Sequence, residues 1–445
     1  MDFNTFKNLV IAKCAEMGIE EYELYYTTAE STTVSAFQQE INEFTSAKEG
    51  GLCFRCIVNG KMGYASTEAL NEATAASVVE QAADNASVLE AEEPVFLGEG
   101  GKTYQEITRK PFELPSTEAL IAKVLETQKS LYDADLMVID GTQTEGVLER
   151  SETAIYNSKG LDLRSTNTLT ALVAAAVIRS GEEMENEYKI KLAELHTIDV
   201  PAMTKELVQT AKNKLGSGVA PTGQYPVVFA PEAMANLLAV YSSIFSSENA
   251  QKGLSKLAGK EGQIIASEKV TLVDDPFHPM SPMQWSFDAE GSPTYAKNLI
   301  EKGEFKTLLY NLKTANMAGV QTTGNASKAG YDAPVGIRPF TLYMAPGEVS
   351  KEELLRKAGN GVYIDSLQGL HAGANAVSGD FSLQSAGFMI EEGKLTNHVK
   401  SFTVAGNFYD LLKNITCVAS DLELPGMGRI GSASVLVEGL SIAGK

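Results

Sequence analysis

Apolar residues recur at helical spacing at the start of the chain. The stripe consists of Phe6, Leu9, Val10 and Cys14. Gly18 follows at a position where helices commonly end, so the pattern predicts one helix before it. Strand-like runs come next at 21–28, 32–37, 51–58 and 62–65. Because Asn59-Gly60 is a strong two-residue hairpin signal, we expect the last two runs to pair as antiparallel strands.

The rest of the first half alternates between helical and strand-like periodicity. Helices are predicted at 67–89, 116–131 and 199–214, and strands at 136–142, 146–156 and 169–179. The acidic segment 90–115 contains Pro and Gly and is predicted to be loop. Residues 216–223 mix flexible and helix-breaking residue types. We therefore predict a domain boundary there, with an N-terminal domain at 1–218 and a C-terminal domain at 219–445.

The second half differs from the first in its predicted secondary structure. It opens with a buried-looking strand at 225–230 and a helix from Pro231, after which short strands dominate. One late helix is indicated by the i, i+3, i+4, i+7 pattern of Phe408, Leu411, Leu412 and Ile415. Asn407 can cap the start of that helix. The chain is predicted to be α+β, with a helix-and-sheet N-terminal domain and a strand-rich C-terminal domain.

Composition and charge argue against several classes of function. The 445 residues are 44% apolar and 21% charged, which is ordinary for a globular protein of two domains. The formal net charge of −20 opposes nucleic-acid binding and also disfavours anionic membrane surfaces. The longest apolar stretch, 169–178, has about half of the ~20 residues that a membrane span needs, and the first residues lack a signal-peptide pattern. We expect a cytoplasmic protein that binds neither nucleic acid nor membrane.

The cysteines and histidines predict no metal or cofactor site. Cys53 and Cys56 have redox or zinc spacing, but residues three apart in a strand point to opposite faces, so their sulfurs should diverge. Only four histidines occur, and none has another at i+3 to i+5. A hydrolytic zinc site takes about three protein ligands, so we expect none from this chain alone. His371 lies in a small-residue loop that could approach a ligand or form an exposed turn.

Two acidic groups could bind a hard cation. Asp274-Asp275 precedes Pro276 and fits a strand-end turn whose carboxylates cap backbone amides. Asp288 and Glu290 also read as turn residues, since the alternating spacing of a calcium loop is missing. The functional interpretation stays open for both groups, and a hydrolase using Asp288, Glu290 or His371 remains one hypothesis.

Several short motifs together resemble the TldD/PmbA family. They are Asp274-Asp275-Pro276, Phe287-Asp288-Ala289-Glu290-Gly291, Thr322-Thr323-Gly324-Asn325, Ser378-Gly379-Asp380-Phe381-Ser382 and Val404-Ala405-Gly406-Asn407. With residues 50–58 and the layout of the first half, the resemblance spans nearly the whole chain. Older descriptions present such proteins as proposed modulators of DNA gyrase. The resemblance implies a peptidase in which a TldD-type subunit pairs with a TldE/PmbA-type subunit.

The resemblance also locates where zinc ligands would stand. A TldD-type subunit carries a His-Glu-x-x-x-His helix and a later cysteine. On that pattern the two histidines and the glutamate correspond to Ala239, Ile244 and Val240, and the cysteine corresponds to Met427. Alanine, valine and isoleucine offer zinc no lone pair, and a thioether does not replace a thiolate. The i, i+5 spacing spans about 140° on a regular helix, so the metal-bearing helix must be locally distorted.

The chain therefore resembles the TldE/PmbA type. We expect a TldD-type metallopeptidase subunit as its partner, zinc only in that partner, and a homodimer when the chain is isolated. Its role would be to bind unfolded peptide by strand addition and to complete a substrate chamber. Candidate peptide-binding residues, carried over from the motifs, are Thr323, Gly324, Asn325, His371, Gly379, Asp380, Phe381 and Ser382. The alternative is a stand-alone homo-oligomer that binds peptides or proteins without catalysis.

Overall fold

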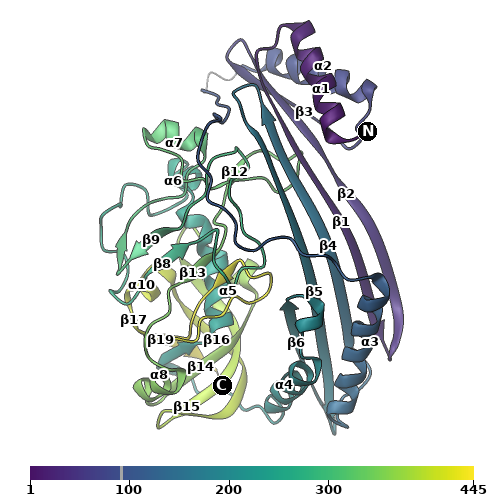
Figure 1. The fold of residues 1–445 in the computed structure, drawn as a ribbon. Helices are drawn as coiled ribbons and strands as arrows, with labels where there is room; N and C mark the ends of the chain where they lie inside the picture. The colour runs from purple at the N-terminus through teal and green to yellow at the C-terminus, as the bar shows by residue number, and fades with distance from the viewer. Residues whose placement is uncertain (91–93, 445) are drawn as a thin grey trace.

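The first half of the chain forms one six-stranded antiparallel sheet of long strands (Figure 1). A computed structural model describes residues 1–90 and 94–444. The strands are β1 (Glu21–Phe37), β2 (Glu40–Val58), β3 (Lys61–Thr67), β4 (Gln143–Asn157), β5 (Asp162–Ser180) and β6 (Glu183–Leu192). Their order is β3-β2-β1-β4-β5-β6. The predicted Asn59-Gly60 hairpin is confirmed, because Val58 pairs with Lys61 and both turn residues have positive φ.

Two helix pairs cover opposite ends of this sheet (Figure 1). α1 (Phe3–Met17) and α2 (Glu72–Val88) pack at one end, and α3 (Thr117–Ala134) and α4 (Val200–Asn213) pack at the other. A short 3₁₀ turn, η1 (Leu195–Thr197), precedes α4. Each helix pair buries its own apolar cluster, so the middle of the long strands is left free for contact with the second half of the chain.

Several predicted boundaries in the first half were wrong. The runs 21–28 and 32–37 are one strand, because β1 pairs with β2 and β4 along its whole length. The predicted strand 136–142 is a turn with a single bridge between Val138 and Ile178. The helix predicted at 67–89 begins only at Glu72, since Asn71 and Thr74 form a capping box there.

The segment predicted to be a loop at 90–115 has no helix or strand over 94–115, and residues 91–93 lie outside the described part. It crosses the molecule between the two halves (Figure 1). Tyr104 donates its hydroxyl proton to the Gly291 carbonyl at 2.9 Å, and the Gln284 side chain accepts from the Thr108 amide at 2.8 Å. The segment therefore ties the sheet to the C-terminal half.

The C-terminal half is built around a small closed sheet. Its strands are β7 (Gly223–Phe229), β14 (Gly361–Gln368), β15 (Asp380–Glu391), β16 (Lys394–Asn407), β17 (Ile415–Val418) and β19 (Val435–Ala443). The order is β16-β15-β14-β7-β19-β17, and β16 also pairs with β19, which closes the ring. The largest apolar cluster of the protein lies between this ring and its helices.

Shorter elements complete this half. The strands β8 (Leu272–Asp274), β9 (Lys297–Glu301), β10 (Glu304–Phe305), β13 (Leu342–Met344) and β18 (Ile430–Gly431) form a second sheet, and β11 (Ala326–Ser327) pairs with β12 (Gly336–Ile337). The helices are α5 (Pro231–Tyr241), η2 (Ser242–Phe245), α6 (Ser247–Gln251), α7 (Leu312–Ala318), α8 (Lys351–Ala358), α9 (Leu370–Gly373) and α10 (Phe408–Lys413). The α+β prediction is confirmed, with a strand-rich C-terminal half.

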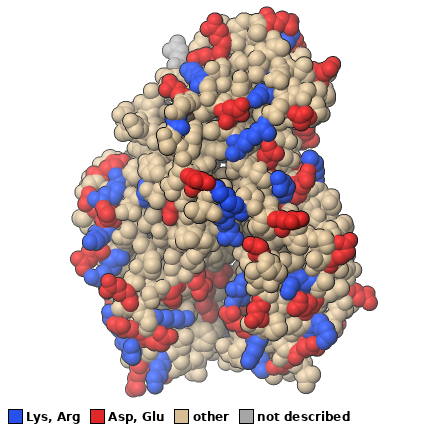
Figure 2. Space-filling view, in the orientation of Figure 1, with Lys and Arg blue, Asp and Glu red and all other residues tan. Residues whose placement is uncertain are grey.

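The late helix was predicted correctly at its start and wrongly at its end. The Asn407 side chain accepts the Tyr409 amide at 3.0 Å, as expected for a cap. The helix stops at Lys413, and Ile415 belongs to β17 instead. No helix among the described residues combines the length and apolarity needed to cross a membrane. On the face shown in Figure 2, acidic and basic side chains are interspersed, without an extended basic surface.

Candidate functional site

The helix that follows β7 is a packed core element. Leu237, Leu238, Tyr241, Ile244 and Phe245 are each at most 1% exposed and belong to the large C-terminal cluster. The α-helix ends at Tyr241 and continues as the 3₁₀ turn η2, so the helical geometry changes in the middle of the expected metal motif. The segment is thus built for packing.

The four positions aligned with zinc ligands differ widely in environment. Ala239 is exposed, Val240 is partly buried, Ile244 is 1% exposed and Met427 is 52% exposed. Their side chains offer no nitrogen, oxygen or thiolate ligand, so the residues present do not fit zinc. Among the described residues, no group of three or more His, Cys, Asp or Glu could hold a metal ion.

Part of the predicted peptide-binding set lies beside the end of α5. His371 is exposed in α9, which packs against α5. The Tyr241 hydroxyl donates to the Asp380 carbonyl at 2.9 Å, and Asp380 and Ser382 expose their side chains at the start of β15. Phe381 between them is 3% exposed and is a core residue.

Gly379 has a structural reason of its own. Its φ is +86°, and a Cβ there would lie 2.5 Å from the ring of Tyr409. Any other residue would be strained and would push that ring away. The glycine therefore shapes the turn that exposes Asp380.

The second part of the set is inside the protein. Asn325 is 0% exposed and donates to the Asp274 carboxylate at 2.7 Å, and the Thr323 hydroxyl bonds the backbone of Tyr310. Gly324 has a φ of +67°, and a Cβ there would lie 2.3 Å from the Pro293 carbonyl oxygen. These residues hold a loop in place; their polar groups are turned toward the protein itself.

Asp274 and Asp275 behave as the turn interpretation predicts. Asp274 is 0% exposed and accepts the Phe340 amide at 2.7 Å and the Thr341 amide at 3.2 Å. Asp275 accepts the Phe277 amide at 2.9 Å. Lys297, 8% exposed, lies 3.3 Å from the Asp274 carboxylate and balances its charge. Both carboxylates are used in capping the local backbone.

The Cys-x-x-Cys sulfurs diverge as predicted. Cys53 lies on the face of β2 near Lys328, whereas Cys56 joins Cys14 in the cluster under α1 and α2. All four cysteines are buried and free. Burial raises the pKa of Cys56 to about 11, so its thiol stays protonated at neutral pH.

A buried charge cluster joins the two halves, and the sequence interpretation had singled out only one of its members, Glu290. The Arg55 Nη2 atom of β2 lies 2.6 Å from Glu23 Oε1 of β1, and its Nη1 atom lies 4.0 Å from Glu290 Oε1 of the C-terminal half. All three side chains are at most 6% exposed. Asn157 donates to the second oxygen of Glu23 at 3.2 Å. The sequence feature that could have indicated this cluster is Arg55, a charged residue inside the apolar run 52–58.

The neighbouring carboxylates Asp288 and Glu290 are held by backbone amides. Asp288 accepts from Glu290 and Ser292 with one oxygen and from Ala326 with the other, each at 2.9 Å. Glu290 accepts from the Leu312 amide at 2.8 Å. Burial raises the pKa of Asp288 to about 6 and that of Glu290 to about 7.

These raised pKa values predict a specific pH dependence. The folded chain holds protons on both groups that the unfolded chain releases near their ordinary values of 3.8 and 4.5. The contribution of these two groups to the free energy of unfolding should therefore be largest at the acid end and decrease as pH rises from about 4 to about 7. Glu290→Gln should flatten this slope in urea unfolding midpoints, whereas Glu182→Gln on an exposed turn should leave it unchanged. Equal slopes in the two variants would contradict the assignment.

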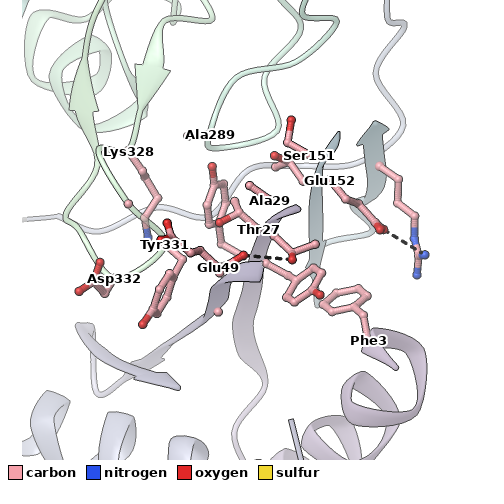
Figure 3. Close-up of a pocket in the computed structure, with 18 of the residues that line it drawn as sticks. Phe3, Thr27, Ala29, Glu49, Ser151, Glu152, Ala289, Lys328, Tyr331 and Asp332 are labelled. Atoms are coloured by element: carbon pink, nitrogen blue, oxygen red, sulfur yellow. Dashed lines mark hydrogen bonds and ion pairs between the residues drawn. The ribbon is translucent and has the colours of Figure 1, made fainter. Parts of the chain in front are cut away.

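A large pocket opens where the middle of the sheet faces the C-terminal half (Figure 3). Its volume is about 1240 Å³. Thr27, Ala29 and Glu49 form one side, and Lys328, Tyr331 and Asp332 of the loop after β11 form the other (Figure 3). Further lining residues on the C-terminal side are Trp285, Phe287, Arg338 and Phe340. Among the described residues, the helices of the first half pack at the two ends of the sheet, which leaves room for the pocket at its middle.

Two glycines make room for the pocket wall. A Cβ on Gly51 would lie 2.7 Å from the ring of Tyr331, so the tyrosine ring can rest on β2 only if this position is glycine. Gly50 has a φ of +140° and lies against the Thr27 backbone. The Tyr331 hydroxyl donates to Glu68 at 3.1 Å, which fastens the loop to the first half.

Comparisons with known proteins identify the family. Models of the PmbA/TldA metallopeptidase family match in three parts: domain 1 at residues 22–86, the central domain at 110–215 and the C-terminal domain at 222–444. The chain belongs to the PmbA/TldD metallopeptidase family. The family models thus recognise two units within the stretch that we predicted as a single N-terminal domain at 1–218.

Members of the PmbA/TldD family with known sequence or structure cover nearly the whole chain. A metalloprotease of Methanothermobacter thermautotrophicus is 27% identical over 94% of this chain and 92% of its own length. A Thermotoga maritima structure described as a proposed modulator of a DNA gyrase is 31% identical, with a TM-score of 0.91, and covers 99% of this chain and 100% of that one. The structure of TldE from Thermococcus kodakarensis is 26% identical, with a TM-score of 0.88, over 98% and 99% of the two chains.

Proposed function

We propose that this chain is a TldE/PmbA-type subunit that acts in proteolysis together with a metal-bearing TldD-type partner. The observation that carries the proposal is the residue set at the expected zinc positions. An alanine, a valine, a buried isoleucine and an exposed methionine leave neither metal ligands nor a carboxylate to activate water. The likeness to TldE over 98% of the chain supports the same subunit type.

In this proposal the chain binds unfolded peptide and completes the chamber in which the partner cleaves it. His371, Asp380 and Ser382 are exposed and lie beside α5. In this proposal α5 corresponds to the helix that carries the metal ligands in the partner. The buried Thr323, Gly324 and Asn325 would support the neighbouring loop rather than touch peptide. Zinc is held only by the partner, the isolated chain forms a homodimer, and the complex works in the cytoplasm.

The test is co-expression with a TldD-type subunit from the same genome. We expect the two chains to co-elute as one species in size-exclusion chromatography with light scattering. Cleavage of an unfolded reporter peptide should need both chains and should be abolished by a zinc chelator. The partner alone and this chain alone are the matched controls.

Two outcomes would contradict the proposal. Chelator-sensitive cleavage by this chain alone would give it catalytic residues that the proposal denies. A homo-oligomer that binds peptide but does not associate with any TldD-type subunit would favour the stand-alone binding protein instead.

A further inference from the structure

The large pocket between the sheet and the C-terminal half contains two cations without counterions. Lys328 and Arg338 line it, and neither forms an ion pair with any residue in the described part of the chain. The other two basic residues of the wall are paired: Lys48 with Glu30 at 2.5 Å and Arg164 with Glu152 at 3.6 Å. In a chain with 57 acidic and 37 basic residues, two unpaired cations in one cavity are unexpected.

The two cations share one neighbour, Tyr25 of β1. The Lys328 Nζ atom lies 4.8 Å from the centre of the Tyr25 ring. Burial raises the pKa of Tyr25 to about 12, while the nearby charge of Arg338 acts in the opposite direction. The phenol thus remains protonated, and its hydroxyl bonds to no described residue. Three hydrogen-bond donors therefore gather in one part of the pocket.

Lys328 lies within hydrogen-bond reach of the Cys53 thiol, but no described carboxylate pairs with Lys328 or Arg338. Asp288 also lines the pocket, but both of its oxygens are already bonded to backbone amides. Glu49 and Asp332 line the pocket but lie beyond ion-pair distance of both cations. Burial lowers the pKa of Lys328, because the charged form of a lysine is disfavoured away from water when no counterion is present. An anion that binds between the two cations would balance their charge and accept hydrogen bonds from them.

The size and walls of the pocket favour an anion that is part of a larger molecule. At about 1240 Å³ it exceeds the 300–1,000 Å³ typical of small-molecule sites. The walls add the aromatic side chains of Trp285, Phe287 and Phe340, which suit side chains of varied kind.

We propose that this pocket binds a peptide through a carboxylate, held between Lys328 and Arg338 with the Tyr25 hydroxyl as a third donor. This inference rests on the proposed peptide-binding role and adds a chemical preference to it. The carboxylate is either the C-terminus of the peptide or an acidic side chain. In a chain of net charge −20 the local cations counteract the general repulsion of acidic ligands.

The experiment uses the full chain and three eight-residue peptides of Ala, Ser and Gly. One ends in a carboxylate, one ends in a carboxamide, and one ends in a carboxamide but contains a single aspartate. Trp285, the only tryptophan, lines the pocket and reports binding by fluorescence. We expect at least one carboxylate peptide to bind about tenfold more tightly than the neutral amide. Which of the two does so identifies the source of the carboxylate.

Matched variants separate recognition from loss of fold. Arg338→Gln and Lys328→Gln should abolish the preference for carboxylate, whereas Lys48→Gln, which removes a paired cation from the same wall, should retain it. Equal affinities of all three peptides for the wild-type chain, or an unchanged preference in Arg338→Gln, would overturn carboxylate recognition and leave peptide binding intact. If no peptide binds to the chain or to its complex with the partner, the peptide-binding role itself fails.

Discussion

Replacing Arg55 with methionine is expected to lower the free energy of unfolding by about 3–5 kcal/mol. Arg55 is 5% exposed and neutralises two carboxylates, those of Glu23 and Glu290. Burial alone would lower the pKa of Arg55, but the charges of the two glutamates outweigh it and raise that pKa above its ordinary value. Removing the cation leaves Glu23, 1% exposed, as a buried charge without a counterion, held only by the hydrogen bond from Asn157. Urea unfolding followed by circular dichroism measures the loss.

A second variant shows whether the charge or the packing is responsible. In Glu23→Gln/Arg55→Met, the Glu23 charge is removed together with the cation, so a substantial part of the stability should return. As a control, Lys110→Met removes an exposed ion pair with Glu106 at 2.7 Å and should change the free energy by less than about 0.5 kcal/mol. If the double variant were as unstable as Arg55→Met, packing of the arginine side chain would be the cause.

Periodicity predicted the kinds of elements well but not their lengths. The helix at the start of the chain and the Asn59-Gly60 hairpin are local features, and local residues decide them. β1 runs through polar residues such as Glu30 and Ser31, which no alternating apolar pattern marks. Those residues are strand because β2 and β4 flank them on both sides, and this is a long-range condition.

The motifs that resemble the family proved to be of two kinds. Asn325 and Asp274 bond each other in the interior, at 0% exposure each, so their motifs mark how loops are held. Asp380 and Ser382 are exposed and remain candidates for peptide contact. A sequence alone does not distinguish buried structural residues from exposed binding residues. An amide or a carboxylate is the same residue type whether it bonds to the protein or to a ligand.

The residues of the pocket were even harder to predict from the sequence. Lys328 and Arg338 follow the paired strands β11 and β12 of the C-terminal half, and only the packing of the two halves brings Tyr25 of β1 beside them. A lysine or arginine in a loop is normally solvated and paired, so neither position attracts attention by residue type. What distinguishes the two cations is that no described residue is their counterion, and this can be established only from the positions of many residues in the folded protein.

Placing histidine at the two motif positions of α5 and η2 is expected to destabilise the protein without creating a zinc site. In Ala239→His/Ile244→His, the histidine at position 244 replaces an apolar side chain that is 1% exposed. Loss of apolar burial and desolvation of an unpaired imidazole should together cost about 3–5 kcal/mol. Ala239→His alone changes an exposed residue and should stay within about 0.5 kcal/mol. Urea unfolding and metal analysis of the purified variants measure both effects.

Zinc titration distinguishes missing ligands from missing geometry. Two histidines provide fewer than the three protein ligands of a catalytic site, and the change from α-helix to 3₁₀ turn after Tyr241 falls between them. We therefore expect zinc to leave the unfolding midpoint of the double variant unchanged. A ligand that binds only the folded state raises its stability, so a zinc-dependent recovery in the double variant but not in Ile244→His would show that the two positions are already arranged to bind metal. In that case the residue types alone, and not the backbone, would separate this chain from a metal-bearing subunit.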